Sequence, residues 1–156
     1  KKFGASESAS RYDRLAGLVD TNVLVYRYDP SSPSKRDAAR ALLRARVESI
    51  ELYIAHQSLI EFVNTVTRPV RGTNAPLLSV TEAIAEAETL LSSFPVLFPN
   101  RDVFLLALRG MAAYGISWFD ANIWACAEYY GLDTIYTEDA GFGTRIGDVR
   151  IVNPFA

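Results

Sequence analysis

Short apolar segments alternate along this chain with segments of helical periodicity. The strand candidates are residues 15–20 (LAGLVD), 52–55 (LYIA), 95–98, 134–137 (TIYT) and 149–152 (VRIV). Apolar residues at helical spacing predict helices over residues 35–47, 57–67, 79–91, 101–113 and 118–130. This alternation is typical of a parallel sheet covered by helices on both faces. We therefore predict an α/β fold around a short, mostly parallel central sheet.

Length and composition fit a single domain. The chain has 156 residues, of which 49% are hydrophobic and 22% charged. Residues 15–156 are assigned to this domain, and the polar residues 1–14 are interpreted as a flexible extension or a cloning remnant. No apolar run reaches the roughly 20 residues that span a bilayer. Cys126 is the only cysteine and has no intramolecular partner, so we expect a cytoplasmic protein.

The charge of the chain limits how it can bind a phosphate-bearing partner. The formal net charge is -2, whereas a protein that binds nucleic acid by charge alone is usually basic. A bound divalent metal would offset phosphate repulsion locally. Arginine must supply most other phosphate contacts, because the only lysines are Lys1, Lys2 and Lys35. The candidates near the predicted active end or in loops are Arg27, Arg68, Arg71 and Arg145.

Two acidic residues follow predicted strands directly. Asp20 ends the first strand and Asp139 follows the strand over 134–137. Ligands of open α/β sheets bind outside the carboxyl ends of the strands, where both acids are expected. A structural role is also open for each, as a turn or cap residue for Asp20 and as a turn residue beside Gly141 for Asp139. Glu138 leaves the choice of acid after this strand ambiguous.

Two further acids lie in predicted helices. Glu61 follows Ser58 and Asp120 follows Ser117 by three residues, the spacing of a capping box. Asp120 is also surrounded in the sequence by bulky apolar residues, where a carboxylate needs a cation or hydrogen-bond donors. Carboxylates that are brought together repel one another, and Mg²⁺ prefers such oxygen ligands. The four acids therefore predict a metal site.

Four motifs in order resemble the PIN domain family, and within it the VapC toxins of bacterial toxin–antitoxin pairs. The motifs are LVDTNVLVY, SLIEFVN, WFDANIWACA and IYTEDAGFG, and the ending GDVRIVNPF is similar to the last strand of that group. The resemblance covers residues 15 to 155, and its specificity comes from the order and spacing of the motifs. It implies a three-layer α/β/α sandwich and Mg²⁺- or Mn²⁺-dependent RNA cleavage.

The resemblance also implies roles for individual residues. Asp20, Glu61, Asp120 and Asp139 match the catalytic, metal-binding acids of the family, and Asn22 and Thr137 match supporting polar positions. Asp20, Asp120 and Asp139 would hold one metal, while Glu61 would position a second metal or the attacking water. Gly141 stands where many relatives carry another acid, which puts a second tightly held metal in doubt.

The same resemblance implies partners, and two other functions remain as alternatives. It implies an RNA substrate, a small VapB-like antitoxin that covers the acids, and a homodimer, but no membrane partner. One alternative is a PIN-like binding module without catalysis. Another is a phosphatase or receiver domain with Asp20 as nucleophile, which Asn22 and the absence of lysine after Lys35 disfavour. His56 and Cys126 are interpreted as structural residues rather than as catalytic groups.

Overall fold

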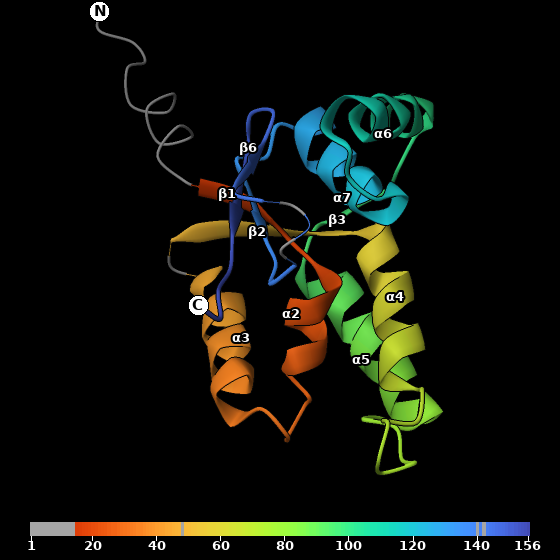
Figure 1. Cartoon of the computed structure of the whole chain (residues 1–156). Helices are drawn as coiled ribbons and strands as arrows, with labels where there is room; N and C mark the ends of the chain where they lie inside the picture. Colours follow the sequence, from red (N-terminus) through yellow and green to blue (C-terminus); the bar gives the residue numbers. More distant parts are fainter. Residues whose placement is uncertain (1–14, 48, 140, 142) are drawn as a thin grey trace, which may run out of the picture.

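The computed structural model describes residues 15–47, 49–139, 141 and 143–156 (Figure 1). Its elements in chain order are β1 (Leu15–Val19), α2 (Thr21–Tyr26), α3 (Pro33–Ala45), β2 (Ile50–Ala55), α4 (His56–Val66), α5 (Val80–Ser93), β3 (Val96–Leu97), α6 (Arg101–Tyr114), α7 (Trp118–Tyr129), β4 (Thr134–Tyr136), β5 (Arg145–Ile146) and β6 (Val149–Val152). Among the described residues, no helix is long and apolar enough to span a membrane.

The strands form one sheet in the order β3-β2-β1-β4-β6-β5. All neighbouring strands are parallel except β5, which runs antiparallel to β6. The predicted mostly parallel sheet is confirmed. The chain moves from β1 to one side of the sheet through β2 and β3, and later returns to the other side through β4. The boundary between β1 and β4 is therefore a switch point, where such sheets bind ligands.

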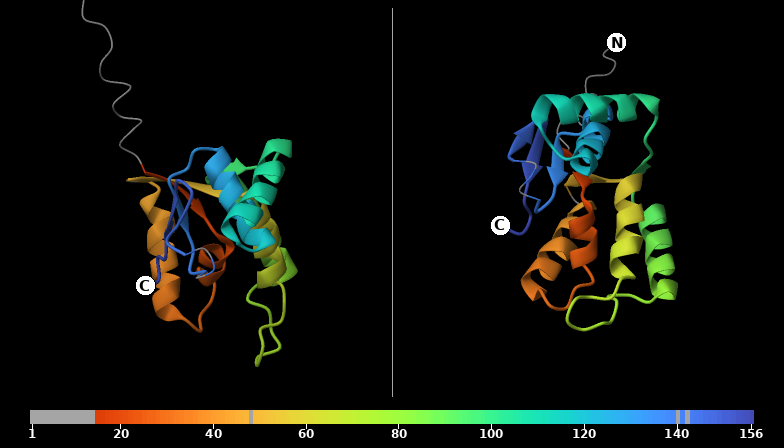
Figure 2. Two further views of the ribbon diagram at one scale, coloured as in Figure 1. Left: turned by 45° about the horizontal axis from the view of Figure 1, so that its top comes forward. Right: turned by 45° about the vertical axis from the view of Figure 1, so that its right-hand side comes forward.

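Helices cover both faces of the sheet and form a three-layer sandwich (Figure 2). Successive residues of a strand face opposite sides, so Leu18 packs in one hydrophobic core and Val19 in the other. The first core contains buried residues of α6 and α7. The second contains buried residues of α2, α3, α4 and α5. Both cores hold β1 and β4 rigidly, and these two strands lead into the acids.

Two elements were not indicated by the sequence, α2 and β5. The segment of α2, TNVLVY, is apolar and rich in β-branched residues, so it looks like a continuation of the preceding strand. The chain turns instead at Asp20, whose side chain accepts a hydrogen bond from the Thr21 amide and caps the helix. Val23 and Leu24 are then fully buried in the second core. Tertiary packing overrides the local preference here.

The predicted capping box at Ser58 and Glu61 is wrong. Helix α4 begins at His56, directly after β2, and its N-cap residue Ala55 offers no side-chain cap. Ser58 lies fully buried within the helix, and its hydroxyl has no hydrogen-bond partner among the described residues. Glu61 is thus free of a capping role. The pair Ser117–Asp120 does cap α7, through a bond from the Asp120 amide to the Ser117 hydroxyl.

Helices α6 and α7 pack closely at Gly110. A Cβ atom on Gly110 would lie 2.3 Å from Cζ3 of Trp124. The indole of Trp124 is fixed in turn, because its Nε1 donates to the backbone oxygen of Ile146 at 3.0 Å. The glycine is therefore required by the approach of the indole, although glycine disfavours a helix interior.

We predict that Gly110→Ala destabilises the protein. Alanine would gain about 1 kcal/mol in helix propensity, but overpacking against Trp124 typically costs about 1–3 kcal/mol. Urea unfolding should show a lower free energy of unfolding than wild type. Ala112→Gly, at an exposed position of the same helix, reports the propensity term alone. A more stable Gly110→Ala protein would contradict the packing described here.

Candidate active site

The predicted acids meet in a pocket of about 410 Å³ at the carboxyl ends of β1 and β4. The acids that line it are Asp20, Asp29, Glu61, Asp120, Glu138 and Asp139. Of the residues that the structure describes, no lysine or arginine lines this pocket. The arginines expected near the active end (Arg27, Arg68, Arg71 and Arg145) therefore do not line it. The pocket is strongly acidic, so an anionic substrate would be repelled from it without a cation.

Asp20 is placed by the pairing of β1 with β4. The Asp20 amide donates to the backbone oxygen of Tyr136 at 3.0 Å, which continues the register of the two strands. The residue that follows β4, Thr137, then lies beside the Asp20 carboxylate. Its hydroxyl donates to Oδ2 of Asp20 at 2.8 Å, while the Thr21 amide donates to Oδ1 at 2.7 Å. Asp20 is only 8% exposed, so its orientation is fixed.

Thr137 connects Asp20 with the two other residues assigned near it. Its buried hydroxyl oxygen accepts hydrogen bonds from Nδ2 of Asn22 at 2.9 Å and from the Asp139 amide at 3.0 Å. One hydroxyl thus joins β4, the first turn of α2 and the loop that carries Asp139. Asn22 and Thr137 thus bind one another, and Thr137 binds the Asp20 carboxylate and the Asp139 amide.

Glu61 is held by two residues that the sequence did not single out. The Thr21 hydroxyl donates to Oε2 of Glu61 at 2.7 Å, and Nε2 of Gln57 donates to Oε1 at 2.8 Å. Gln57 lies one turn before Glu61 on α4, a spacing at which side chains meet on a helix surface, and this signal was available in the sequence. The contact with Thr21 depends on the unpredicted α2.

Asp120 and Asp139 both lie close to Gly141. A Cβ atom on Gly141 would lie 3.1 Å from Oδ1 of Asp139 and 3.3 Å from Oδ2 of Asp120. The Gly141 amide donates to the same Asp139 oxygen at 2.8 Å. A side chain at position 141 would therefore point toward Asp120 and Asp139. In this chain the position contributes a backbone donor instead.

The acids disturb each other's ionisation. Burial raises the pKa of Asp20 to about 6, and repulsion from Glu61 and Asp120 adds to the effect. Burial also raises the pKa of Asp120, together with repulsion from Asp139 and Glu61. Among the described residues, no three acids are positioned to coordinate one ion as they stand. The donor set nevertheless fits a hard divalent cation, because it consists of carboxylate oxygens, and the carboxylates repel one another.

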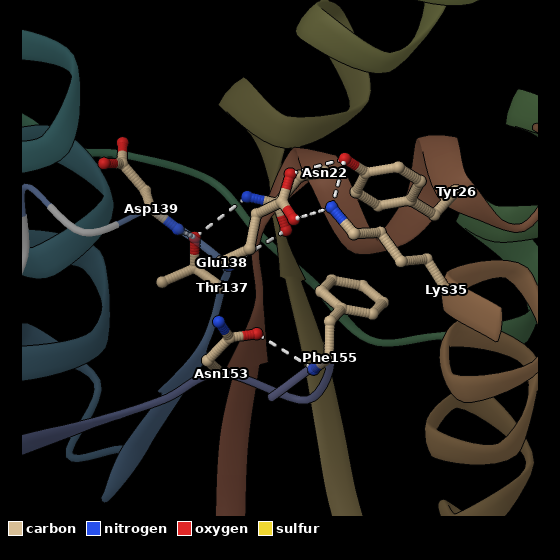
Figure 3. A network of polar contacts seen from close by, with 8 residues as sticks. All are labelled: Asn22, Tyr26, Lys35, Thr137, Glu138, Asp139, Asn153 and Phe155. Atoms are coloured by element: carbon tan, nitrogen blue, oxygen red, sulfur yellow. Dashed lines mark hydrogen bonds and ion pairs between the residues drawn. The ribbon is translucent and has the colours of Figure 1, made fainter. Parts of the chain in front are cut away.

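The ambiguity between Glu138 and Asp139 is resolved by the partners of Glu138. Its carboxylate accepts from the Tyr26 hydroxyl at 2.6 Å and from Nζ of Lys35 at 2.8 Å. Burial would raise the pKa of Glu138, but these hydrogen bonds lower it below its ordinary value. Figure 3 shows Glu138 turned toward Tyr26 and Lys35, while the Asp139 carboxylate points the opposite way. Of these two acids, Asp139 is therefore the one that remains available beside Asp120.

His56 and Cys126 lie outside the acidic pocket. The His56 ring packs against Phe98, with 4.9 Å between ring centroids. Cys126 is buried, and burial raises the pKa of its thiol to about 12. Neither group has the environment of a nucleophile or a general base.

The buried Asp20 carboxylate predicts a pH-dependent stability of the metal-free protein. Its pKa is about 6 in the folded state and 3.8 in a model peptide, so the folded state binds more protons between these values. The free energy of unfolding should therefore fall by about 2 kcal/mol on account of Asp20 between pH 4 and pH 7. Urea unfolding in EDTA should show this fall in wild type and a smaller one in Asp20→Asn. Parallel pH profiles for the two proteins would refute the assigned burial.

We expect the ion pair between Lys35 and Glu138 to restrict the motion of the loop after β4. Lys35→Met removes the cation that holds Glu138, and the Glu138 and Asp139 amides should then exchange faster with solvent. Lys35→Arg keeps the charge and should stay close to wild type. Hydrogen exchange read by mass spectrometry or NMR checks both variants. Unchanged exchange in Lys35→Met would show that Thr137 and Asn22 alone hold this loop.

Comparison with known proteins agrees with the fold. The chain is similar to a toxin–antitoxin complex from Klebsiella pneumoniae (20% identity, 88% of this chain and 97% of that chain, TM-score 0.65). It is also similar to FitAcB from Neisseria gonorrhoeae (22% identity, 89% and 98%, TM-score 0.64). A third similar structure is VapC20 from Mycobacterium tuberculosis, a toxin that cleaves the sarcin–ricin loop (17% identity, 86% and 98%, TM-score 0.61).

Sequence comparison defines the family of the chain. No curated protein matches it significantly in sequence. The family model described as PIN domain matches residues 17–145, which include all four assigned acids. This range also contains β4, most of β1 and the helices that carry the acids. The chain belongs to the PIN domain family.

Proposed function

We propose that this protein is a metal-dependent endoribonuclease, the toxin of a VapBC-type toxin–antitoxin pair, which hydrolyses RNA with metal-activated water. The observation that carries the proposal is the convergence of Asp20, Glu61, Asp120 and Asp139 at the β1–β4 switch point. A protein gains nothing in stability from burying a carboxylate among other carboxylates. Such an arrangement is typical of a site built for a cation.

Asp20, Asp120 and Asp139 are the residues that would hold Mg²⁺ or Mn²⁺. A bound divalent cation lowers the pKa of a coordinated water and stabilises charge on the phosphate. Thr137 and the Thr21 amide hold the Asp20 carboxylate in one orientation, which limits the reorganisation needed on binding. Glu61, held by Thr21 and Gln57, would orient the attacking water or a second cation. Because position 141 is a glycine, a second cation would have one carboxylate fewer than the resemblance implies for many PIN domains.

The proposed protein partners follow from charge and exposed apolar surface. An antitoxin that covers the acidic pocket would present a basic segment to it. Exposed apolar side chains on α4 and α5, including Ile60, Ile84 and Leu91, offer further surface to an antitoxin or a second copy of the chain. The solved relatives from K. pneumoniae and N. gonorrhoeae support an antitoxin partner.

We predict that Asp20→Asn abolishes most cleavage of a labelled structured RNA pool. Loss of an outer-sphere partner of a metal typically costs about 10- to 100-fold, so loss of a direct ligand should cost at least about 100-fold. Wild type should cut with Mg²⁺ or Mn²⁺ and not with EDTA. Asp37→Asn, on α3 outside the pocket, is the matched control and should cut like wild type.

The same samples distinguish the alternatives. Equal cleavage by Asp20→Asn and wild type would refute the catalytic assignment. Wild type that neither cuts RNA nor binds Mn²⁺ in calorimetric titration would favour a PIN-like binding module. Circular dichroism of each variant verifies that it is folded.

A further inference from the structure

A second pocket, of about 420 Å³, lies beside the acidic one and has the opposite charge. We call it the arginine pocket, and its lining residues are Arg27, Tyr28, Arg40, Leu43, Arg44, Arg46 and Glu86. Four guanidinium groups and one carboxylate give these lining residues a formal charge of +3, by 4 − 1. The whole chain has a formal charge of -2. Positive charge is thus concentrated here.

Within the part of the chain that the structure describes, the arginines of this pocket form no ion pairs. The ion pair found there joins Lys35 and Glu138. Glu86, the single acid in the lining, accepts a hydrogen bond from the Tyr28 hydroxyl. Four guanidiniums that share one pocket with a single carboxylate leave an excess of positive charge, which an anion would offset.

Two of these arginines are held by aromatic rings. Cζ of Arg46 lies 4.1 Å from the centroid of Phe94, and Nη1 of Arg46 donates to the backbone oxygen of Leu43 at 3.2 Å. Cζ of Arg27 lies 5.4 Å from the centroid of Tyr28. These contacts already restrict both side chains, so less side-chain entropy would be lost when a ligand binds. The planar guanidinium matches the paired oxygens of a phosphate group.

The two pockets share one wall. Val25, Tyr26 and Asp29 line the acidic pocket, whereas Arg27 and Tyr28 line the arginine pocket. The C-terminal turn of α2 and the residues after it therefore separate them. A helix is about 10 Å across, so the two pockets lie within reach of a single nucleic acid strand.

We propose that the arginine pocket binds a phosphodiester group of the RNA strand away from the cleaved bond, an inference that rests on the proposed ribonuclease function. The described lining of the acidic pocket contains no arginine or lysine that could bind a phosphate. The arginine pocket supplies such groups one helix width away and fixes where the strand crosses the acids. An acidic segment of a protein partner is the competing occupant, because guanidiniums also pair with carboxylates.

The test measures RNA binding without cleavage. A fluorescently labelled single-stranded RNA is titrated in EDTA at several salt concentrations with wild type and with Arg40→Gln/Arg44→Gln. The double variant should bind at least about 10-fold more weakly. Its dependence of log affinity on log salt should flatten by about 0.7 for each phosphate that the variant no longer neutralises. Arg101→Gln/Arg109→Gln, which removes the same charge from exposed positions on α6, should weaken binding much less.

A conservative variant separates charge from folding. Arg40→Lys/Arg44→Lys should keep most of the salt dependence and have a somewhat lower affinity, since lysine lacks the planar fork. Thermal unfolding of all variants identifies any that fail to fold. Wild-type affinity and salt dependence in Arg40→Gln/Arg44→Gln would overturn the proposal. Unchanged RNA binding together with weaker binding of a labelled polyglutamate peptide would assign the pocket to an acidic protein segment instead.

This test is independent of the metal site. Binding is measured in EDTA, so a failure of metal-dependent cleavage leaves the RNA affinities measurable. Conversely, an arginine pocket that does not bind RNA leaves the comparison of wild type with Asp20→Asn unaffected.

Discussion

The structure depends on a carboxylate held in a nearly closed position at the end of a parallel strand pair. Asp20 leaves β1 beside β4, and the pairing of these strands fixes its contact with Thr137. Burial and the neighbouring acids make its ionisation costly. The two hydrophobic cores on either face of the sheet offset this cost, because they hold β1 and β4 from both sides. The two hydrophobic cores thus stabilise the fold, whereas the acids lie where the strands end.

Hydrogen-bond partners, rather than the number of acids, decide which carboxylates belong to the site. Glu138 and Asp139 are adjacent in the chain, yet Glu138 is bound by Lys35 and Tyr26 and serves to anchor the loop. Asp139 turns toward Asp120 and the backbone of Gly141. Lys35, the only lysine among the described residues, thereby has a structural role that also defines the site. Because Lys35 binds Glu138 on one side of this loop, Asp139 faces the other acids on the opposite side.

The segregation of charge explains how a slightly acidic chain could handle a polyanion. The acidic pocket would attract a cation, and the arginine pocket an anion, on opposite sides of the C-terminal turn of α2. The net charge of the chain includes both pockets and therefore does not reveal that the charges are separated. In the sequence the arginines of α3 look like those of a solvated helix face, and of the four arginines that line the pocket only Arg27 was among the contact candidates. Their convergence with Arg27 depends on the packing of α2 against α3.

The fold class could be predicted from the sequence, as could four of the acids that line the pocket. Apolar runs of strand length alternating with helical periodicity require a covered parallel sheet, and the strand ends at Asp20 and Asp139 lie at its ligand-binding edge. The order of the motifs identified Glu61, Asp120, Asn22 and Thr137, which the structure places around the same pocket or against its acids. The tertiary structure was needed to show that TNVLVY is a helix, that Ser58 is buried, that Thr21 binds Glu61, and that Glu138 is bound by Lys35. The physical reason is that these outcomes depend on contacts between residues far apart in the chain, where packing and long-range hydrogen bonds outweigh local propensity.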